Sequence, residues 1–233
     1  MKKRTIITVS IIAGVVLLGG TAVVAGPIVY RDLIVGEAAS APTVTAAPSA
    51  TAGAATIDPA ELSGAWVVTD GSYAGYRVDE VLNDTDVTVV GRTEQVTGSL
   101  AVEDLTLTAA DLTVDVASIT TDSSSRDAYF RDQALRVSEH PEATFSLTGP
   151  VTADATPVIG EVQTISATGD LAIAGVTRSV TFELEAVLNA DGGQVAGSIP
   201  ITFADFGVEA PNLGFVSVEP DGFIEFSLVI VPA

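Results

Sequence analysis

The side chains that most often carry out catalysis are scarce in this chain of 233 residues, which contains no cysteine and one histidine, His140. Without cysteine there is no disulfide, no thiolate nucleophile and no cysteine-ligated zinc or iron–sulfur site. His140 precedes a proline, with no serine motif beside it and no further ligand at a metal-binding spacing. We therefore interpret His140 as a turn residue and expect no catalytic residue, no metal site and no cofactor.

Acidic side chains are abundant, but no spacing singles out two of them as a catalytic pair. Of the 30 aspartates and glutamates, Asp32 and Glu37 precede residue 56, so 30 − 2 = 28 follow it, beside six arginines and no lysine. A surface of this charge repels phosphate backbones, so we expect no nucleic-acid partner. The composition is typical of a soluble exported domain and predicts a protein that is not an enzyme.

Arg126 and Asp127 are the polar pair with the most specific placement. They open a segment, about residues 122–138, that the spacing of Phe130, Ala134 and Val137 predicts to be a short helix. One interpretation is a structural ion pair and helix cap. The other places Arg126 and Asp127 at the mouth of a cavity, where Arg126 meets a polar or phosphorylated ligand end.

Aromatic side chains are the other candidates for a binding site. They lie at apolar positions of alternating segments, and either line a cavity or fill a core. The residues that we expect to contact an apolar ligand are Trp66, Tyr76, Tyr129, Phe130, Phe145, Phe182, Phe206 and Phe226.

The segments that carry these side chains alternate between apolar and polar residues with the two-residue period of β-strands. Clear examples are residues 112–116, 180–186 and 224–230. Turn signals separate many of the segments, among them Ala174-Gly175 and Asp221-Gly222. We expect an all-β domain over residues 58–233, a sandwich or an extended closed barrel of about eight antiparallel strands, with the helix covering one end.

A barrel of eight strands either fills its interior with side chains or holds one small ligand. Several positions that we expect to point inward are small and would leave space for an apolar guest: Ala101, Ala167, Gly169, Ala186 and Gly197. Ordinary core packing explains the same pattern, so the residues alone leave both interpretations open.

The N-terminus predicts export. A basic tip, residues 1–4, precedes an uncharged apolar run over residues 5–30, long enough for a transmembrane helix that acts as a signal anchor. The alternative is a cleaved signal peptide whose apolar region spans residues 6–18. Residues 31–57 are rich in Ala, Thr and Pro and predict a linker that does not pack. We expect a single-pass protein of the cell membrane with its domain on the extracytoplasmic side.

Over residues 62–233 the chain resembles the YceI-like polyisoprenoid-binding family. The resemblance depends on the order and spacing of several short motifs: Trp66 with Asp70 and Ser72, Val116–Thr121, Arg126-Asp127, Leu135-Arg136, His140–Phe145, Gly169–Arg178 and Asp205–Val208. It implies a lipocalin-like barrel whose long apolar cavity takes an isoprenoid chain. The chain departs from the family pattern at Tyr129, where a His is frequent, at Ala172, and at Phe203-Ala204, where a basic residue is frequent.

These observations lead us to expect extracytoplasmic binding of a long apolar lipid, of polyisoprenoid or isoprenoid quinone type, inside the barrel. The alternative is a filled barrel that acts as a cell-surface protein-interaction module without a lipid. The partners that we expect are the lipid and the membrane, and a homodimer stays open.

Overall fold

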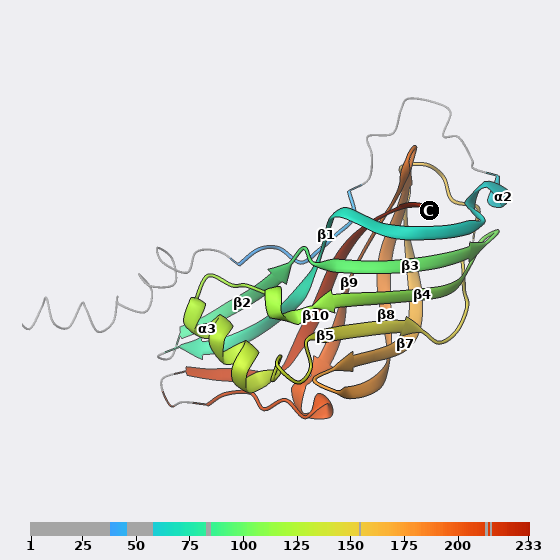
Figure 1. The fold of residues 1–233 in the computed structure, drawn as a ribbon. Coiled ribbons are helices and arrows are strands. Elements are labelled where there is room, and N and C mark those ends of the chain that lie inside the picture. The colour runs from blue at the N-terminus through green and yellow to red at the C-terminus, as the bar shows by residue number, and fades with distance from the viewer. Residues whose placement is uncertain (1–37, 46–57, 83–84, 154, 213, 215) are drawn as a thin grey trace, which may run out of the picture.

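The structure is a computed structural model that describes residues 38–45, 58–82, 85–153, 155–212, 214 and 216–233 (Figure 1). No helix within these ranges is both long and apolar enough to cross a membrane. The predicted basic tip, residues 1–4, and the predicted apolar helix, residues 5–30, lie outside the described part of the chain.

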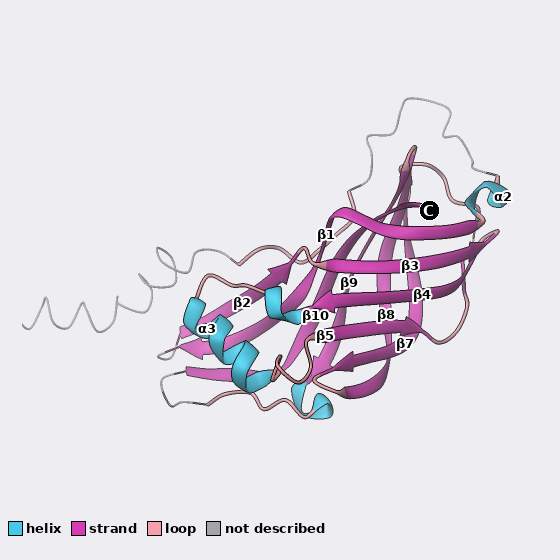
Figure 2. Ribbon diagram, viewed as in Figure 1, coloured by secondary structure: helices cyan, strands magenta, loops and turns pink. Residues whose placement is uncertain are grey.

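Ten antiparallel strands make up the sheet in the described residues, and eight of them close into a barrel (Figure 2). Hydrogen bonds connect the strands in the order β10-β9-β8-β7-β5-β4-β3-β1, and β1 pairs with β10 to close the ring. The strands are β1 (Gly64–Leu82), β2 (Thr85–Thr93), β3 (Val96–Glu103), β4 (Thr106–Asp115), β5 (Glu142–Leu147), β6 (Val151–Thr152), β7 (Val162–Ile173), β8 (Val176–Asn189), β9 (Gly192–Thr202) and β10 (Val216–Pro232). The all-β barrel expected from the alternation is confirmed.

The length of β1 and β10 makes the barrel extended. β10 follows β1 along nearly its whole length, with Trp66 opposite Pro232 and Leu82 opposite Val216. β1 pairs with β3 only over Gly64–Val67, whereas its second half pairs with β2. β2 therefore lengthens the wall beyond the closed ring, and β6 adds a short strand beside β4.

Short helices lie at the two ends of the barrel (Figure 2). The α2 end carries α2 (Pro59–Leu62), the β8–β9 turn and the C-terminus. The α3 end carries η2 (Val116–Ser118), α3 (Ser124–Tyr129), η3 (Phe130–Ala134), η4 (Phe203–Phe206) and the β7–β8 turn. We use these two names for the ends below.

The helix predicted over residues 122–138 is shorter in the structure. Ser123 caps its start, since its hydroxyl oxygen accepts a hydrogen bond from the Arg126 amide. The α-helical part ends at Tyr129, and one wider π-helical turn continues to Ala134. Arg136 then adopts a left-handed conformation, with φ of 49°, which ends the helical run.

The turn predicted at Asp221-Gly222 is wrong, because both residues lie inside β10. Gly222 is opposite Val78, and a Cβ atom at this position would lie 2.8 Å from the Arg77 carbonyl oxygen. Glycine thus permits a close approach of two strands here and does not reverse the chain.

Part of the predicted linker packs against the barrel, so the expectation that residues 31–57 do not pack is wrong for residues 38–45. This segment lies on the outer face, where Val44 joins a small apolar cluster with Val187 and Ala196. We call residues 38–45 the strap.

Candidate functional site

The barrel encloses a cavity of about 690 Å³, lined by residues from all eight strands of the closed ring. This volume lies within the ~300–1,000 Å³ of typical ligand pockets. The wall extends from Leu62 and Leu105 at the α2 end to Tyr129 and Phe206 at the α3 end. Exposed residues line the cavity at both ends, Glu161 at the first and Glu209 at the second, so it is an elongated space that reaches both ends.

The alternation found in the sequence directs apolar side chains into this space. Leu112 of β4, Leu184 of β8 and Ile224 of β10 all line the cavity. Each is only partly buried although it points to the inside of the barrel, because it faces open space and not another side chain. The interior is therefore lined, and not filled, by its apolar residues.

All eight aromatic residues predicted from the sequence lie on the wall of the cavity: Trp66, Tyr76, Tyr129, Phe130, Phe145, Phe182, Phe206 and Phe226. Phe182 makes edge-to-face contacts with Phe145 and with Phe226, at ring-centroid distances of 5.6 and 5.9 Å. Tyr76 stacks on Phe130 at 4.8 Å. Their contact with a ligand stays a prediction.

Trp66 is the only tryptophan of the chain, and its environment suits apolar contact. The indole nitrogen donates a hydrogen bond to the Leu62 carbonyl oxygen at 3.0 Å. Because this satisfies the one polar group of the side chain, the ring can present an apolar face to the cavity. Trp66 is therefore also a natural fluorescent reporter of what enters the barrel.

The small residues predicted to leave space do so only in part. Ala167 and Ala186 line the cavity, whereas Ala101 does not. The space beside Gly169 and Gly197 is filled by aromatic rings. A Cβ at Gly169 would lie 2.3 Å from the Phe145 ring, and one at Gly197 would lie 2.7 Å from the Phe226 ring. These two glycines make room for phenyl rings and not for a guest.

Polar side chains gather at the two ends of the cavity. Glu80 and Arg126 line it at the α3 end, and Gln163 lines it at the α2 end. Glu80 was missed by the sequence analysis. Its position, two residues after Val78 and two before Leu82, places it on the inward face of β1, and the strand period alone could have found it.

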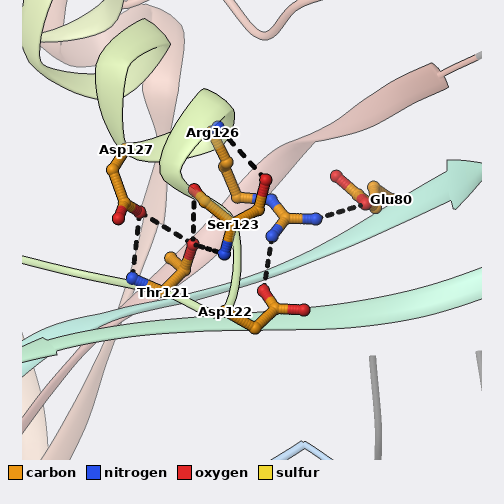
Figure 3. A network of polar contacts seen from close by, with 6 residues as sticks. All are labelled: Glu80, Thr121, Asp122, Ser123, Arg126 and Asp127. Atoms are coloured by element: carbon orange, nitrogen blue, oxygen red, sulfur yellow. Dashed lines mark hydrogen bonds and ion pairs between the residues drawn. The ribbon is translucent and has the colours of Figure 1, made fainter. Parts of the chain in front are cut away.

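Arg126 bridges two carboxylates at the α3 end (Figure 3). Its guanidinium group donates to Glu80 Oε1 at 3.0 Å and to Asp122 Oδ1 at 2.6 Å. Burial lowers the pKa of Arg126, but the charges of Glu80 and Asp122 more than offset this and leave the pKa raised. Arg126 therefore stays cationic, and the three side chains together carry a net charge of about −1.

Asp127, predicted at the cavity mouth beside Arg126, is not among the wall residues of the cavity and does not pair with Arg126. Its carboxylate accepts hydrogen bonds from the Thr121 amide at 2.9 Å and from the Thr121 hydroxyl at 2.8 Å (Figure 3). The Ser123 amide in turn donates to the Thr121 hydroxyl. Asp127 thus holds the loop before α3 and positions Arg126 indirectly.

Tyr76 lies beside this network with its ring on the cavity wall. Burial raises the pKa of its phenol well above the ordinary value, and nearby Arg126 opposes that rise only in part. The phenol therefore stays neutral and can donate or accept a hydrogen bond at the α3 end of the cavity. His140 takes no part in the cavity wall, since its ring packs over Gly175 in the β7–β8 turn.

Comparison with known proteins agrees with this architecture. A polyisoprenoid-binding domain from Saccharophagus degradans, implicated in plant cell wall breakdown, is 20% identical and has a TM-score of 0.60, covering 73% of this chain and 99% of its own. BcnA of Burkholderia cenocepacia is 20% identical, with a TM-score of 0.53 over 66% of this chain and 95% of its own. No curated protein matches the chain. The model of the YceI-like domain matches residues 66–230, and the chain belongs to that family.

Proposed function

We propose that this protein binds a long apolar lipid, of polyisoprenoid or isoprenoid quinone type, inside its barrel on the extracytoplasmic side of a membrane. The observation that carries the proposal is the elongated apolar cavity of about 690 Å³. Each CH₂-sized group moved from water into such a wall contributes ~0.8 kcal/mol, so a five-carbon isoprene unit contributes roughly 4 kcal/mol before the costs of ordering.

The shape and polarity of the cavity favour a chain over a compact ligand. Polar lining groups such as Arg126 and Gln163 lie at the two ends, and the stretch between them is walled by aliphatic and aromatic side chains. A compact polar molecule would lose its hydrogen bonds to water in the middle of the barrel. A flexible apolar chain can lie along the wall and keep a polar end at one mouth.

The family supports the same conclusion. The relative from Saccharophagus degradans is described as a polyisoprenoid-binding domain, and we extend this class of ligand to the present chain. A barrel filled with side chains would leave no space of this size, so the cavity favours the lipid over the alternative of a filled interaction module.

The N-terminal sequence supports the proposed location. The basic tip, residues 1–4, and the apolar run, residues 5–30, would anchor the chain in the membrane and export the barrel. A barrel held beside a bilayer has access to long-chain lipids that are nearly insoluble in water.

The test uses residues 38–233, which contain the strap and every strand of the closed ring. This fragment is purified without detergent, examined by native mass spectrometry, and titrated with a brominated isoprenoid alcohol while Trp66 fluorescence is recorded. We expect a bound lipid in the mass spectrum, or saturable quenching of Trp66 by the added alcohol. Protein that carries no lipid and whose fluorescence does not respond contradicts the proposal.

A further inference from the structure

The strap crosses the outer face of the barrel as an extended segment. Pro42 and Val44 are buried against the barrel, whereas Ala41, Thr43 and Thr45 are exposed. This alternation is that of a strand with one face on a surface. The strap is therefore bound along its length and not merely attached at one residue.

Two arginines hold the first half of the strap. Arg77 donates to the Ala39 carbonyl oxygen at 2.5 Å, and Arg92 donates to the Ser40 carbonyl oxygen at 2.8 Å. Both arginines also pair with Glu225, whose side chain is 1% exposed. The cluster has more positive than negative charge, and a backbone carbonyl group of the strap accepts a hydrogen bond from each arginine, whereas Arg92 Nε has no partner among the described residues.

Apolar packing and two amide bonds hold the second half. Val44 packs on Val187 and Ala196, which are 2% and 1% exposed. The Val44 amide donates to Glu185 at 3.2 Å, and the Thr45 amide donates to Gln194 at 3.3 Å. The contacts thus come from β1 and β2 on one side and from β9 and β8 on the other, and β10 lies between them in the ring.

These contacts fix the direction in which the strap runs. Ala39 contacts Arg77, which is opposite Phe223 in β10, and Thr45 contacts Gln194, which is opposite Val229. From residue 38 to residue 45 the strap therefore runs toward the α2 end, and its beginning points toward the α3 end. Figure 1 shows the same course, with the blue segment passing from the side of β2 toward the β8–β9 turn.

We propose that the strap holds the barrel against the membrane with its α3 end facing the lipid surface. The inference rests on the membrane anchor of the proposed function. With the strap bound, only residues 31–37 remain between the apolar run and the barrel, and seven residues span at most ~25 Å. Strap residue 39 lies at the level of Phe223, about seven residues or ~23 Å along β10 from the α3 end. A seven-residue connection is thus just long enough for this end to meet the membrane.

The opposite orientation does not fit this length. To bring the α2 end to the membrane, the chain before residue 38 would have to reverse its direction, and a reversal takes about four residues. The three that remain span only ~10 Å, whereas the α2 end of β10 lies about nine residues beyond Phe223, or ~30 Å along the strand. The α3 end, with Arg126 and Tyr129 at its mouth, is therefore the end from which a membrane lipid enters.

The chain has no cysteine, so single cysteines can be labelled cleanly in the full-length protein. Asp205→Cys in η4 marks the α3 end and Glu61→Cys in α2 marks the α2 end; both positions are exposed and each change removes one acid. The labelled proteins are reconstituted in phosphatidylcholine vesicles that contain a rhodamine-labelled lipid, and energy transfer to the membrane is measured. We expect at least fivefold more transfer from position 205 than from position 61. Equal transfer, stronger transfer from position 61, or a chain that does not float with the vesicles overturns the proposal.

Release of the strap is the second arm. Val44→Asp places a carboxylate in the apolar cluster beside Glu185 and should free the strap. Energy transfer from position 205 should then be less than twofold that from position 61. Thr43→Asp adds the same charge at an exposed neighbouring position and should keep the ratio. Ten Gly/Ser residues inserted after Glu37 leave strap and barrel unchanged and should also abolish the contrast. A contrast that survives the insertion shows that the strap does not set the orientation.

Lipid uptake by residues 38–233, measured through Trp66, separates this inference from the function on which it rests. If transfer differs between positions 205 and 61 but the barrel takes up no lipid, lipid binding is refuted and the orientation is supported. If the barrel takes up lipid but transfer is equal from the two positions, the orientation is refuted and lipid binding is supported.

Discussion

Filling the cavity with one additional ring should weaken lipid binding without weakening the barrel. Ala186 of β8 lies on the cavity wall and is only partly buried, because it faces the open interior. We expect Ala186→Phe to direct a phenyl ring into this space. A benzene-sized guest takes up a cavity of ~150 Å³, which is about a fifth of the 690 Å³ available here.

The loss of affinity follows from the apolar surface that the ring displaces. If the ring excludes about two or three carbon atoms of the lipid at ~0.8 kcal/mol each, binding weakens by ~2 kcal/mol. This corresponds to roughly a 30-fold increase in Kd. The ring enters existing space, so the free energy of unfolding of the lipid-free protein should stay constant or rise.

The assay pairs titration of Trp66 fluorescence with thermal unfolding, and Thr181→Phe serves as the control. Thr181 is an exposed residue of the same strand, so this variant adds the same ring to the outer face. We expect it to leave Kd within about twofold. If Ala186→Phe instead destabilises the barrel by the ~1–3 kcal/mol typical of overpacking and leaves lipid binding unchanged, the interior is full and our reasoning is refuted.

Three further variants probe the surroundings of the cavity. Burial raises the pKa of Tyr76, so its stabilising effect is complete below the ordinary pKa of ~10 and is lost as pH rises beyond it; between pH 10 and 12, denaturant titrations should show the wild type losing stability faster than Tyr76→Phe. Glu225→Gln removes the charge buried between two arginines and should cost about 3 kcal/mol in the free energy of unfolding; a loss below ~0.5 kcal/mol contradicts this. Gly169→Ala forces Phe145 toward the cavity and should cost ~1–3 kcal/mol and weaken Trp66 quenching. Gly149→Ala, with nothing within 4 Å of the added Cβ, should do neither.

The barrel could be predicted from the sequence because burial imposes a two-residue period on every strand that lines it. The inward positions of β8 and β10, such as Phe182 and Phe226, were assigned correctly for this reason. Asp221-Gly222 misled the prediction, since glycine and aspartate favour turns by local conformation. At Gly222 the deciding factor is instead the close approach of the Arg77 backbone, which no local pattern records.

The strap could not be predicted for a similar reason. Its composition is that of a linker, and its only regular feature is the alternation of Pro42 and Val44, which is too short to distinguish from chance. The residues that bind it, such as Arg92 and Gln194, lie 52 and 149 positions away along the chain. Binding between such distant segments depends on closure of the ring, which brings β2, β1, β10, β9 and β8 to one face.

The site was predictable in its aromatic residues and less so in its polar ones. The strand period placed Phe145 and Phe182 on the wall, but it could not say that Phe145 would cover Gly169. Arg126 reached the cavity because α3 begins where Ser123 caps it, whereas Asp127, one residue later on the helix, turns toward the Thr121 loop. On a helix, neighbouring residues do not share a face.

The size of the cavity also constrains what the folded protein contains. A dry void costs about 24 cal/mol per Å³ in lost contacts, so 690 Å³ would cost roughly 17 kcal/mol. This exceeds the ~5–15 kcal/mol by which typical domains are stable. The interior must therefore hold either water or an apolar guest, and a buried water needs about two to four polar partners. The wall provides such partners near Glu80 and Gln163 at the two ends, but not between Leu112 and Ile224 in the middle. The middle of the barrel is thus suited to an apolar chain, and that chain would contribute to the stability of the fold as well as being its ligand.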